Sequence, residues 1–411
     1  GAGLEPVARI PRRVDGPDAH ILEGVRRRFD ESVDGTIGIE EEYQLLNPQT
    51  LALSNRFEEL HATAEEPQRS RLAGELISSE IEFKTHAHDG FATAARELVE
   101  GRLGVIELAD RLGIPIAIAG VHPFSPWWEQ RIIDTPHYRL RDEELGYIAW
   151  TNNTWAIHAH VGVRGADRAV AVSTALRSVL PELLALSANS PIYMGRDTRL
   201  ASARTQIFTK SFPRCGIPDA YRDFGEYGRF VEMLERTGSI VEALQIWWSV
   251  RPAHAFGTVE TRICDGQTDM GEALAVAALM VACTMAFARD YDEGRELPTH
   301  PRGIIDENMW RAQRYGVEGR MIDLDAGEEI STAEAIERLL IWSEGVHETH
   351  GLDPFLGRVG TMVSEGNGAS RQRALLDKSG DVRAVQADLV ERTRASAVEA
   401  RDALSPVTTK A

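Results

Sequence analysis

Two glutamates, Glu40 and Glu42, stand two residues apart in the segment TIGIEEEYQL at 36–45, which otherwise has the composition of a buried strand. Side chains alternate between the two faces of a strand, so Glu40 and Glu42 project together while Glu41 shares the other face with Ile39. Carboxylates held side by side raise each other's pKa unless a cation neutralises them. Hard divalent cations held by carboxylate oxygens satisfy that requirement.

The same division into an apolar and a charged face recurs in further segments. The charged faces carry Glu80 and Glu82 in GELISSEIEFKTHAH at 74–88, His158 and His160 in WAIHAHVGV at 155–163, and Glu260 and Arg262 in GTVETRICD at 257–265. One such strand alone is typical of a solvated sheet face, which normally mixes Lys, Thr, Ser and Gln. The dominance of carboxylates favours a Mg²⁺ or Mn²⁺ site, and a histidine ligand favours Mn²⁺. Spacing alone leaves the solvated face and the metal site both open.

Arginines accompany these strands in segments rich in Gly, Ser and Asn. They are Arg196, Arg199 and Arg204 in LSANSPIYMGRDTRLASARTQIF at 186–208, and Arg251 and Arg262 in WWSVRPAHAFGTVETRICD at 247–265. A guanidinium group suits a phosphate or a carboxylate. An exposed arginine is more commonly a surface residue, but Arg262 stands two residues from Glu260 on the same strand face.

The elements that must position these residues alternate between two periodicities. Period-two stretches occur at 36–46, 76–85, 114–120, 155–163 and 256–264, and helical patterns occur at 90–113, 168–188, 271–294 and through most of the chain after residue 300. Strands separated by helices predict an α+β fold whose sheet is assembled from distant segments and covered by helices on one face. We expect an N-terminal arm at 1–33 and a single domain at 34–405 with a helical C-terminal portion.

Composition limits the partners and the compartment. The 411 residues have a formal net charge of −18, and the longest basic run is RRR at 26–28, which argues against nucleic acid or an anionic membrane as a partner. Three cysteines without paired spacing favour a reducing cytoplasm. The apolar run at 273–288 is shorter than the roughly 20 residues of a membrane span, so it predicts a buried helix.

The motifs together resemble a known family. They are GIEEEYQLL, ELISSEIEFKT, HAHVGV, LSANSPIYMGRDT, SARTQIF, WWSVRPAHAFGTVETRICD and ENMWRAQRYG, followed by the tail RQRALL and AVQADLVERT. In this order, over residues 34–395, they are similar to the bacterial carboxylate–amine ligases of the glutamate–cysteine ligase type 2 family. The resemblance implies the glutamine synthetase-like catalytic fold, an antiparallel sheet with an open metal-binding face. It also implies a homodimer that uses ATP to join an acid to an amine through an acyl phosphate.

The resemblance also implies roles for individual residues. The expected ligands of Mg²⁺ (or Mn²⁺) are Glu40, Glu42, Glu75, Glu82, His158 and Glu260. The residues expected to bind ATP are His158, Arg251 and Arg204, and those expected to act in catalysis are Arg262, Arg204 and Glu260. His160 is a less secure match, because relatives can carry a different residue there.

Two departures leave the substrates open. Relatives often have Cys-Gly before the first histidine of the HAH segment, where this chain has Trp155, Ala156 and Ile157, and Asp-Thr-Gly where it has Asp197, Thr198 and Arg199. The acid and the amine therefore need not be glutamate and cysteine. Two alternatives stay open beside the ligase: a metal-dependent hydrolase that cleaves amides or phosphoesters with the same carboxylates, and a homologue without catalytic activity.

Overall fold

A seven-stranded sheet with β1 near its centre organises the computed structural model, which describes residues 19–405. The strand order is β10-β11-β5-β1-β3-β2, and β4 also pairs with β1. All of these pairs are antiparallel. The strands are β1 (Ile37–Leu45), β2 (Leu72–Ala73), β3 (Glu80–Lys84), β4 (Ile116–Ala117), β5 (Ile157–Gly162), β10 (Val250–Ala253) and β11 (Thr258–Thr261). The α+β prediction is confirmed.

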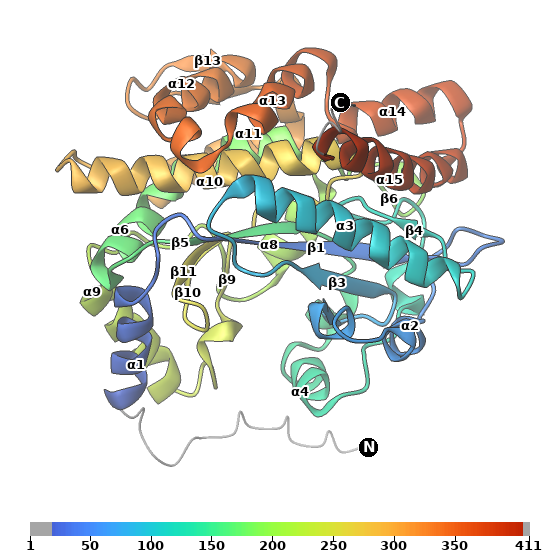
Figure 1. Cartoon of the computed structure of the whole chain (residues 1–411), viewed down its shortest axis with the longest axis horizontal. Coiled ribbons are helices and arrows are strands. Elements are labelled where there is room, and N and C mark those ends of the chain that lie inside the picture. The colour runs from blue at the N-terminus through green and yellow to red at the C-terminus, as the bar shows by residue number, and fades with distance from the viewer. Residues whose placement is uncertain (1–18, 406–411) are drawn as a thin grey trace, which may run out of the picture.

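Helices cover one face of this sheet. They are α3 (Phe91–Asp110), α10 (Met270–Asp292), α11 (Arg302–Tyr315), α12 (Thr332–His350), α13 (Asp353–Glu365), α14 (Gly368–Ser379) and α15 (Val382–Leu404). In Figure 1, α10 runs along the sheet and the later helices lie beyond it, while α1 (Ala19–Asp30), α4 (Pro136–Leu145) and α9 (Phe224–Arg236) lie on the opposite side. The remaining helices are α2 (Phe57–Thr63), α5 (Tyr147–Thr151), α6 (Ala166–Leu176), α7 (Leu180–Ser187) and α8 (Ala203–Ser211).

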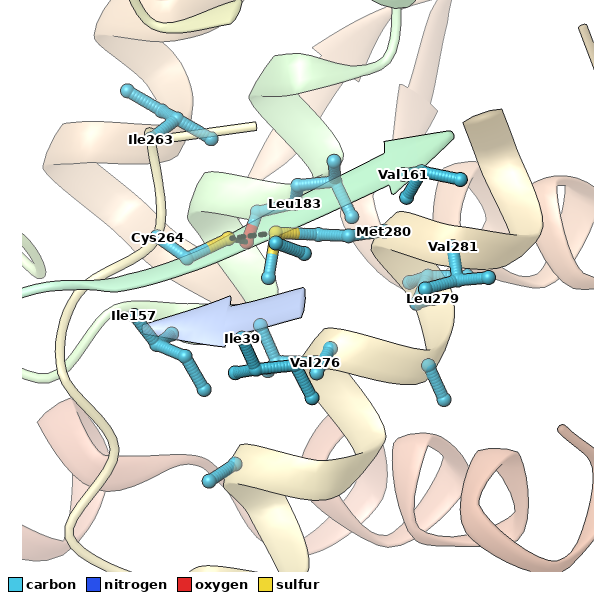
Figure 2. Packing of buried hydrophobic residues seen from close by; sticks show 14 of the residues in the cluster. Ile39, Ile157, Val161, Leu183, Ile263, Cys264, Val276, Leu279, Met280 and Val281 are labelled. Atoms are coloured by element: carbon cyan, nitrogen blue, oxygen red, sulfur yellow. Dashed lines mark hydrogen bonds between the residues drawn. The ribbon is translucent and has the colours of Figure 1, made fainter. Parts of the chain in front are cut away.

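The main core lies between α10 and the apolar face of the sheet. Figure 2 shows Ile39 of β1 and Ile157 of β5 beside Val276 and Met280 of α10, and all four side chains are buried. By length and apolar composition α10 could cross a membrane, but 94% of its most apolar window is buried inside the protein. The prediction of a buried helix at 273–288 is confirmed.

Two predicted segments differ in the structure. The helical pattern at 168–188 is broken into α6 and α7, bent by 60°, with Pro181 in the first turn of α7, because proline cannot donate the backbone hydrogen bond that a continuous helix requires. Part of the expected N-terminal arm forms α1, where Val25 and Phe29 lie one turn apart and are buried. Residues 1–18 of the expected arm lie outside the described residues.

The remaining elements are short. They are the strands β6 (Ile192–Tyr193), β7 (Arg196–Asp197), β8 (Cys215–Gly216), β9 (Trp247–Trp248), β12 (Arg320–Ile322) and β13 (Glu329–Ser331), and the 3₁₀ turns η1 (Arg69–Arg71), η2 (Trp127–Glu129), η3 (Ala243–Gln245) and η4 (Gly316–Glu318). Strand β10 was not predicted. It forms a hairpin with β11 through residues 254–257 and places Arg251 directly opposite Glu260.

Candidate active site

A pocket of about 740 Å³ lies on the charged face of the sheet, away from α10. Strands β1, β3, β5, β10 and β11 contribute its floor, and α1, α4, α8 and η3 contribute its walls. Antiparallel pairing brings the charged residues of neighbouring strands directly opposite one another. The opposed pairs are Glu40 with Lys84, Glu40 with His158, Glu42 with Glu82, and Glu260 with His160.

Glu40 is surrounded by the nitrogen atoms of three side chains. Its carboxylate lies 3.2 Å from Nδ1 of His158, 3.6 Å from Nε2 of His160 and 3.3 Å from Nζ of Lys84. Burial opposes ionisation of Glu40, but His160, His158 and Lys84 together hold the pKa of this carboxyl well below its usual value. Burial and the nearby charge of Arg262 lower the pKa of His158 to about 4, so its imidazole is neutral at physiological pH and can act as a ligand.

A second group of carboxylates lacks such compensation. Oxygens of Glu42, Glu75 and Glu82 lie within 4.8 Å of one another. Burial and then the charge of Glu75 raise the pKa of Glu42 to about 7, and burial and then the charge of Glu40 raise the pKa of Glu82 well above its usual value. Glu80, which opposes Gln44 rather than another acid in the register, has its pKa raised by burial and by Glu42.

Glu82 is only partly compensated. Lys84 Nζ lies 2.6 Å from its Oε2, but the same ammonium group also lies 3.3 Å from Glu40, and the Glu82 side chain is buried. An ionised carboxylate that is removed from water and only partly compensated carries a large desolvation penalty. A divalent cation bound by the neighbouring oxygens would offset it.

Glu260 marks the other edge of the site and is held by two arginines. Arg251 donates from Nε to Oε2 at 2.6 Å, and Arg262 donates from Nη1 to Oε1. Although burial opposes ionisation, these two guanidinium groups hold the pKa of Glu260 well below its usual value. His160 Nε2 lies 3.7 Å from Glu260 Oε1. Burial disfavours its charged form, but Glu260 and Glu40 raise the pKa of His160.

Arg204 is fixed in the first turn of α8 by backbone and side-chain contacts. Its Nη1 donates to the carbonyl of Ile263 at 2.8 Å and its Nη2 to the carbonyl of Arg262 at 3.1 Å. Ser202 caps α8 by accepting from the amide of Thr205. Its hydroxyl also lies 2.9 Å from Oδ1 of the fully buried Asp265. These contacts orient one guanidinium group toward the pocket, which Arg204 lines.

The donor chemistry fits divalent cations. Three groups of side chains could each hold an ion, namely Glu40 with His160 and Glu260, Glu40 with Glu82 and His158, and Glu42 with Glu75 and Glu82. Each group offers carboxylate oxygens, and two of them add an imidazole nitrogen. Carboxylates with one nitrogen suit Mg²⁺ and, more readily, Mn²⁺. Arginines at one edge can therefore neutralise a polyphosphate, and the carboxylates at the other can bind the cations that accompany it.

The structure brings together all of the residues predicted for the site. Glu40, Glu42, Glu75, His158, Arg204, Arg251, Glu260 and Arg262 line the pocket, and Glu82 lies behind its surface within ligand distance of Glu42 and Glu75. Arg196 and Arg199 are exposed and are not among the lining residues. Two participants were not assigned: Lys84, which alternates with Glu82 on the strand and could have been inferred from period two, and Glu80.

Comparisons with known proteins agree with this geometry. The sequence model of a family described as glutamate-cysteine ligase family 2 (GCS2) matches residues 36–393. A protein of Rubrobacter xylanophilus, provisionally named glutamate–cysteine ligase 2-3, is 40% identical over 367 residues, which cover 89% of this chain and 99% of the relative. A protein of Sorangium cellulosum, provisionally named glutamate–cysteine ligase 2, is 38% identical over 360 residues, 87% of this chain and 96% of the relative.

A solved structure shares the fold at low sequence identity. The crystal structure of glutamate–cysteine ligase from Francisella tularensis, in complex with AMP, superposes with a TM-score of 0.64 and 13% identity, and the match covers 91% of this chain and 90% of that one. At this identity the likeness establishes the fold, an antiparallel sheet with helices on one face.

Proposed function

The chain belongs to glutamate-cysteine ligase family 2 and is an ATP-dependent carboxylate–amine ligase, and from this premise we propose that it activates its acid as an acyl phosphate. The acid is an amino acid such as glutamate, and the products are an amide, ADP and phosphate. The observation that carries the proposal is the meeting of clustered, buried carboxylates with fixed arginines at one pocket.

The proposed reaction has two displacement steps. One oxygen of the substrate carboxylate attacks the γ-phosphorus of ATP, the bond from that phosphorus to the bridging oxygen breaks, and ADP leaves. The amine nitrogen then attacks the acyl carbon, phosphate leaves with the electron pair of the acyl C–O bond, and the nitrogen loses a proton. Phosphoryl transfer requires positioning and charge neutralisation more than covalent chemistry from the protein.

The carboxylates and His158 are proposed to hold Mg²⁺ or Mn²⁺. The ligands would be Glu40, Glu42, Glu75, Glu82, His158 and Glu260, with His160 completing the set beside Glu260. When bound, the cations would supply charge neutralisation for the phosphates of ATP. The neighbouring carboxylates repel one another in the protein without cations. A bound cation would remove this repulsion, so the repulsion favours cation binding.

The arginines are proposed to act on the transferred phosphoryl group. Arg204 is oriented by two backbone carbonyls, so little rotational freedom remains to be lost when phosphate binds. Arg262 is fixed by Glu260, which also orients Arg251. Glu260 thus holds both guanidinium groups in place, and these stabilise the negative charge that develops during transfer.

Isotope transfer tests the proposed intermediate directly. The purified protein, ATP and Mg²⁺ or Mn²⁺ are incubated with pools of amino acids and small amines, and mass spectrometry identifies any condensed product. The acid of that product is then supplied with ¹⁸O in both carboxylate oxygens. We expect ADP and one ¹⁸O atom in each released phosphate. Label recovered in AMP, or condensation without label in phosphate, would contradict the acyl phosphate.

Matched variants distinguish site residues from surface residues in the same assay. Arg262→Lys keeps the charge but loses the planar fork, and we expect product formation to fall. Arg196→Ala removes an exposed arginine that does not line the pocket, and we expect it to behave as the wild type. Equal activity in both variants would remove Arg262 from the proposed mechanism.

The hydrolase alternative finds no support in the family match or in the similar proteins described above. Its signature would be cleavage of an amide or phosphoester without nucleotide. Amide cleavage by the protein with Mn²⁺ in the absence of ATP would revive it. The homodimer and the cytoplasmic location remain predictions, and light scattering on the purified protein tests the first.

A further inference from the structure

A row of aromatic rings lines the pocket beyond the charged floor. It consists of Phe208 of α8, Phe212 directly after the end of α8, and Trp247 of β9, all of which are lining residues. Ring centroids are 4.8 Å apart between Phe208 and Phe212 and 5.3 Å apart between Phe212 and Trp247. We call these three residues the aromatic wall. The mechanism proposed above uses none of them.

The aromatic wall begins at the reacting centre. The guanidinium carbon of Arg204 lies 5.8 Å from the centroid of the Phe208 ring. At the far end, the guanidinium carbon of Arg141 in α4 lies 5.7 Å from the Trp247 ring, and that of Arg214 lies 5.5 Å from it. A substrate group that extends from the acyl phosphate beside Arg204 would therefore meet Phe208 first and Trp247 last.

Hydrogen bonds connect the elements around Trp247, at the far end of the aromatic wall. Arg141 donates to Glu242 at 2.8 Å, and Gln245 Nε2 donates to Glu144 at 2.7 Å, so α4 is joined to η3. Arg214 Nε donates to the carbonyl of Gln245 at 3.0 Å. These contacts hold Trp247 in place before any substrate arrives, which reduces the ordering cost of binding.

Further apolar side chains extend the same surface. Leu145 at the end of α4 and Val241 and Leu244 around η3 also line the pocket. Leu244 is 52% exposed and Val241 is 44% exposed. A small polar amine such as glycine or cysteine would leave this surface in contact with water, whereas a bulky apolar side chain would cover it.

The position of the carboxylates indicates which of the two substrates reaches the wall. Glu80, which is not one of the proposed metal ligands, lines the pocket together with Tyr138 of α4, the helix that also carries Arg141. A carboxylate attracts an ammonium group and repels an acid. Of the two substrates, the amine therefore suits this part of the pocket better.

We propose that the amine substrate carries an aromatic or branched apolar side chain, which packs against Phe208, Phe212 and Trp247. The inference rests on the ligase activity proposed above and specifies the class of its second substrate. An apolar pocket discriminates between side chains by about 10–200-fold for each methylene that it contacts. The aromatic wall offers contacts for a whole ring or a branched chain.

A panel of amines tests the inference. With ATP, Mg²⁺ or Mn²⁺ and the acid identified by mass spectrometry, kcat/KM is measured for phenylalanine, tryptophan, leucine and phenethylamine, and for glycine, alanine and cysteine. We expect kcat/KM to be at least about 10-fold higher for the first set. In Trp247→Ala and Phe208→Ala this preference should fall about 10-fold or more.

The preference is a ratio within one protein sample, so partial unfolding of a variant does not change it. Trp310→Ala removes a tryptophan of α11 that is 47% exposed and is not among the pocket-lining residues, and it should keep the wild-type ratio. A wild type that ligates glycine or cysteine in preference to the bulky amines overturns the inference and leaves the ligase standing. Absence of ligation with every amine overturns the ligase proposal and this inference with it.

Discussion

Neighbouring glutamates on the two faces of β1 differ in how their charges are compensated. On the helix-covered face, Glu41 is fully buried and paired with the equally buried Arg102 of α3, which donates from Nε to Oε2 at 3.0 Å and from Nη2 to Oε1. Arg102 also donates to the carbonyls of Gln267 and Thr268. On the pocket face, Glu42 lies against other carboxylates.

This difference separates structural from functional carboxylates on the same strand. A buried charge is tolerated when a partner and hydrogen bonds compensate it, as for Glu41. Where several acids gather and only part of their charge is compensated, as for Glu42, Glu75 and Glu82, the carboxylates repel one another and a bound cation would relieve the repulsion. We therefore expect variants on the two faces to change different properties of the protein.

The largest effect on stability should come from the Glu41–Arg102 pair. Glu41→Ala leaves the Arg102 guanidinium buried without its carboxylate, and we expect a loss of about 3–5 kcal/mol in the free energy of unfolding, measured by urea denaturation. Glu82→Gln, on the neighbouring strand, removes a charge that lies beside Lys84 but also beside Glu42 and Glu75, and it should cost less stability because the relief of repulsion offsets the lost ion pair. If both variants lost similar amounts of unfolding free energy, the proposed difference between a structural and a functional face would be wrong.

The largest effect on activity should come from the pocket face. Glu42→Gln keeps the size of the side chain but removes its charge, and we expect the ATP-dependent rate to fall by about 10²–10³-fold while the urea midpoint is retained. Glu107→Gln, on an exposed part of α3, is the control and should match the wild type. If Glu42→Gln retains its full rate of ADP formation, the proposed role of this glutamate is wrong.

A smaller effect separates a structural histidine from those of the site. His122 is buried away from the pocket, donates from Nε2 to the carbonyl of Leu51 and accepts from the amide of Ser125, and burial lowers its pKa to about 3. Below pH ~6.5 His122 binds a proton in the unfolded chain but not in the folded protein. The free energy of unfolding therefore falls as the pH drops from 6.5 toward 3.

In that interval His122 alone changes the free energy of unfolding by about 1.4 kcal/mol per pH unit. In His122→Gln the loss of unfolding free energy between pH 6 and 5 should be smaller than in the wild type by about that amount. Urea denaturation of both proteins at pH 8, where His122 is neutral in both states, measures the separate cost of the lost hydrogen bonds. An unchanged slope would show that His122 is protonated in the folded protein and that burial does not control its pKa.

Alternation along single strands was predictable because it depends on neighbouring residues only. Period two separates Glu40 and Glu42 from Glu41, and it places Lys84 with Glu82. The apolar content of 273–288 likewise indicates the buried helix α10. Contacts between distant residues were not predictable in this way. The partner of Glu41 stands 61 residues away, so its identity depends on how α3 packs against the sheet.

The same limit explains what the sequence could not show of the pocket. The order β10-β11-β5-β1-β3-β2 sets which charged residues oppose one another, and it depends on packing between segments far apart in the chain. Phe208 and Phe212 of the aromatic wall are four residues apart, which is a helical spacing, but Trp247 comes from a distant segment that the sequence does not place beside them. Helix α1 could have been predicted, because Leu22, Val25 and Phe29 recur at helical spacing and pack against the core.

Binding of Mn²⁺ tests most directly whether the pocket-face carboxylates are a cation site. Electron paramagnetic resonance measures free Mn²⁺ during titration of the wild type, Glu82→Gln and the exposed control Glu107→Gln, with and without ATP. We predict that Glu82→Gln binds Mn²⁺ at least about 10-fold more weakly than the wild type, while the control matches it. Equal affinity in a folded Glu82→Gln variant would contradict the assignment of this face to divalent cations.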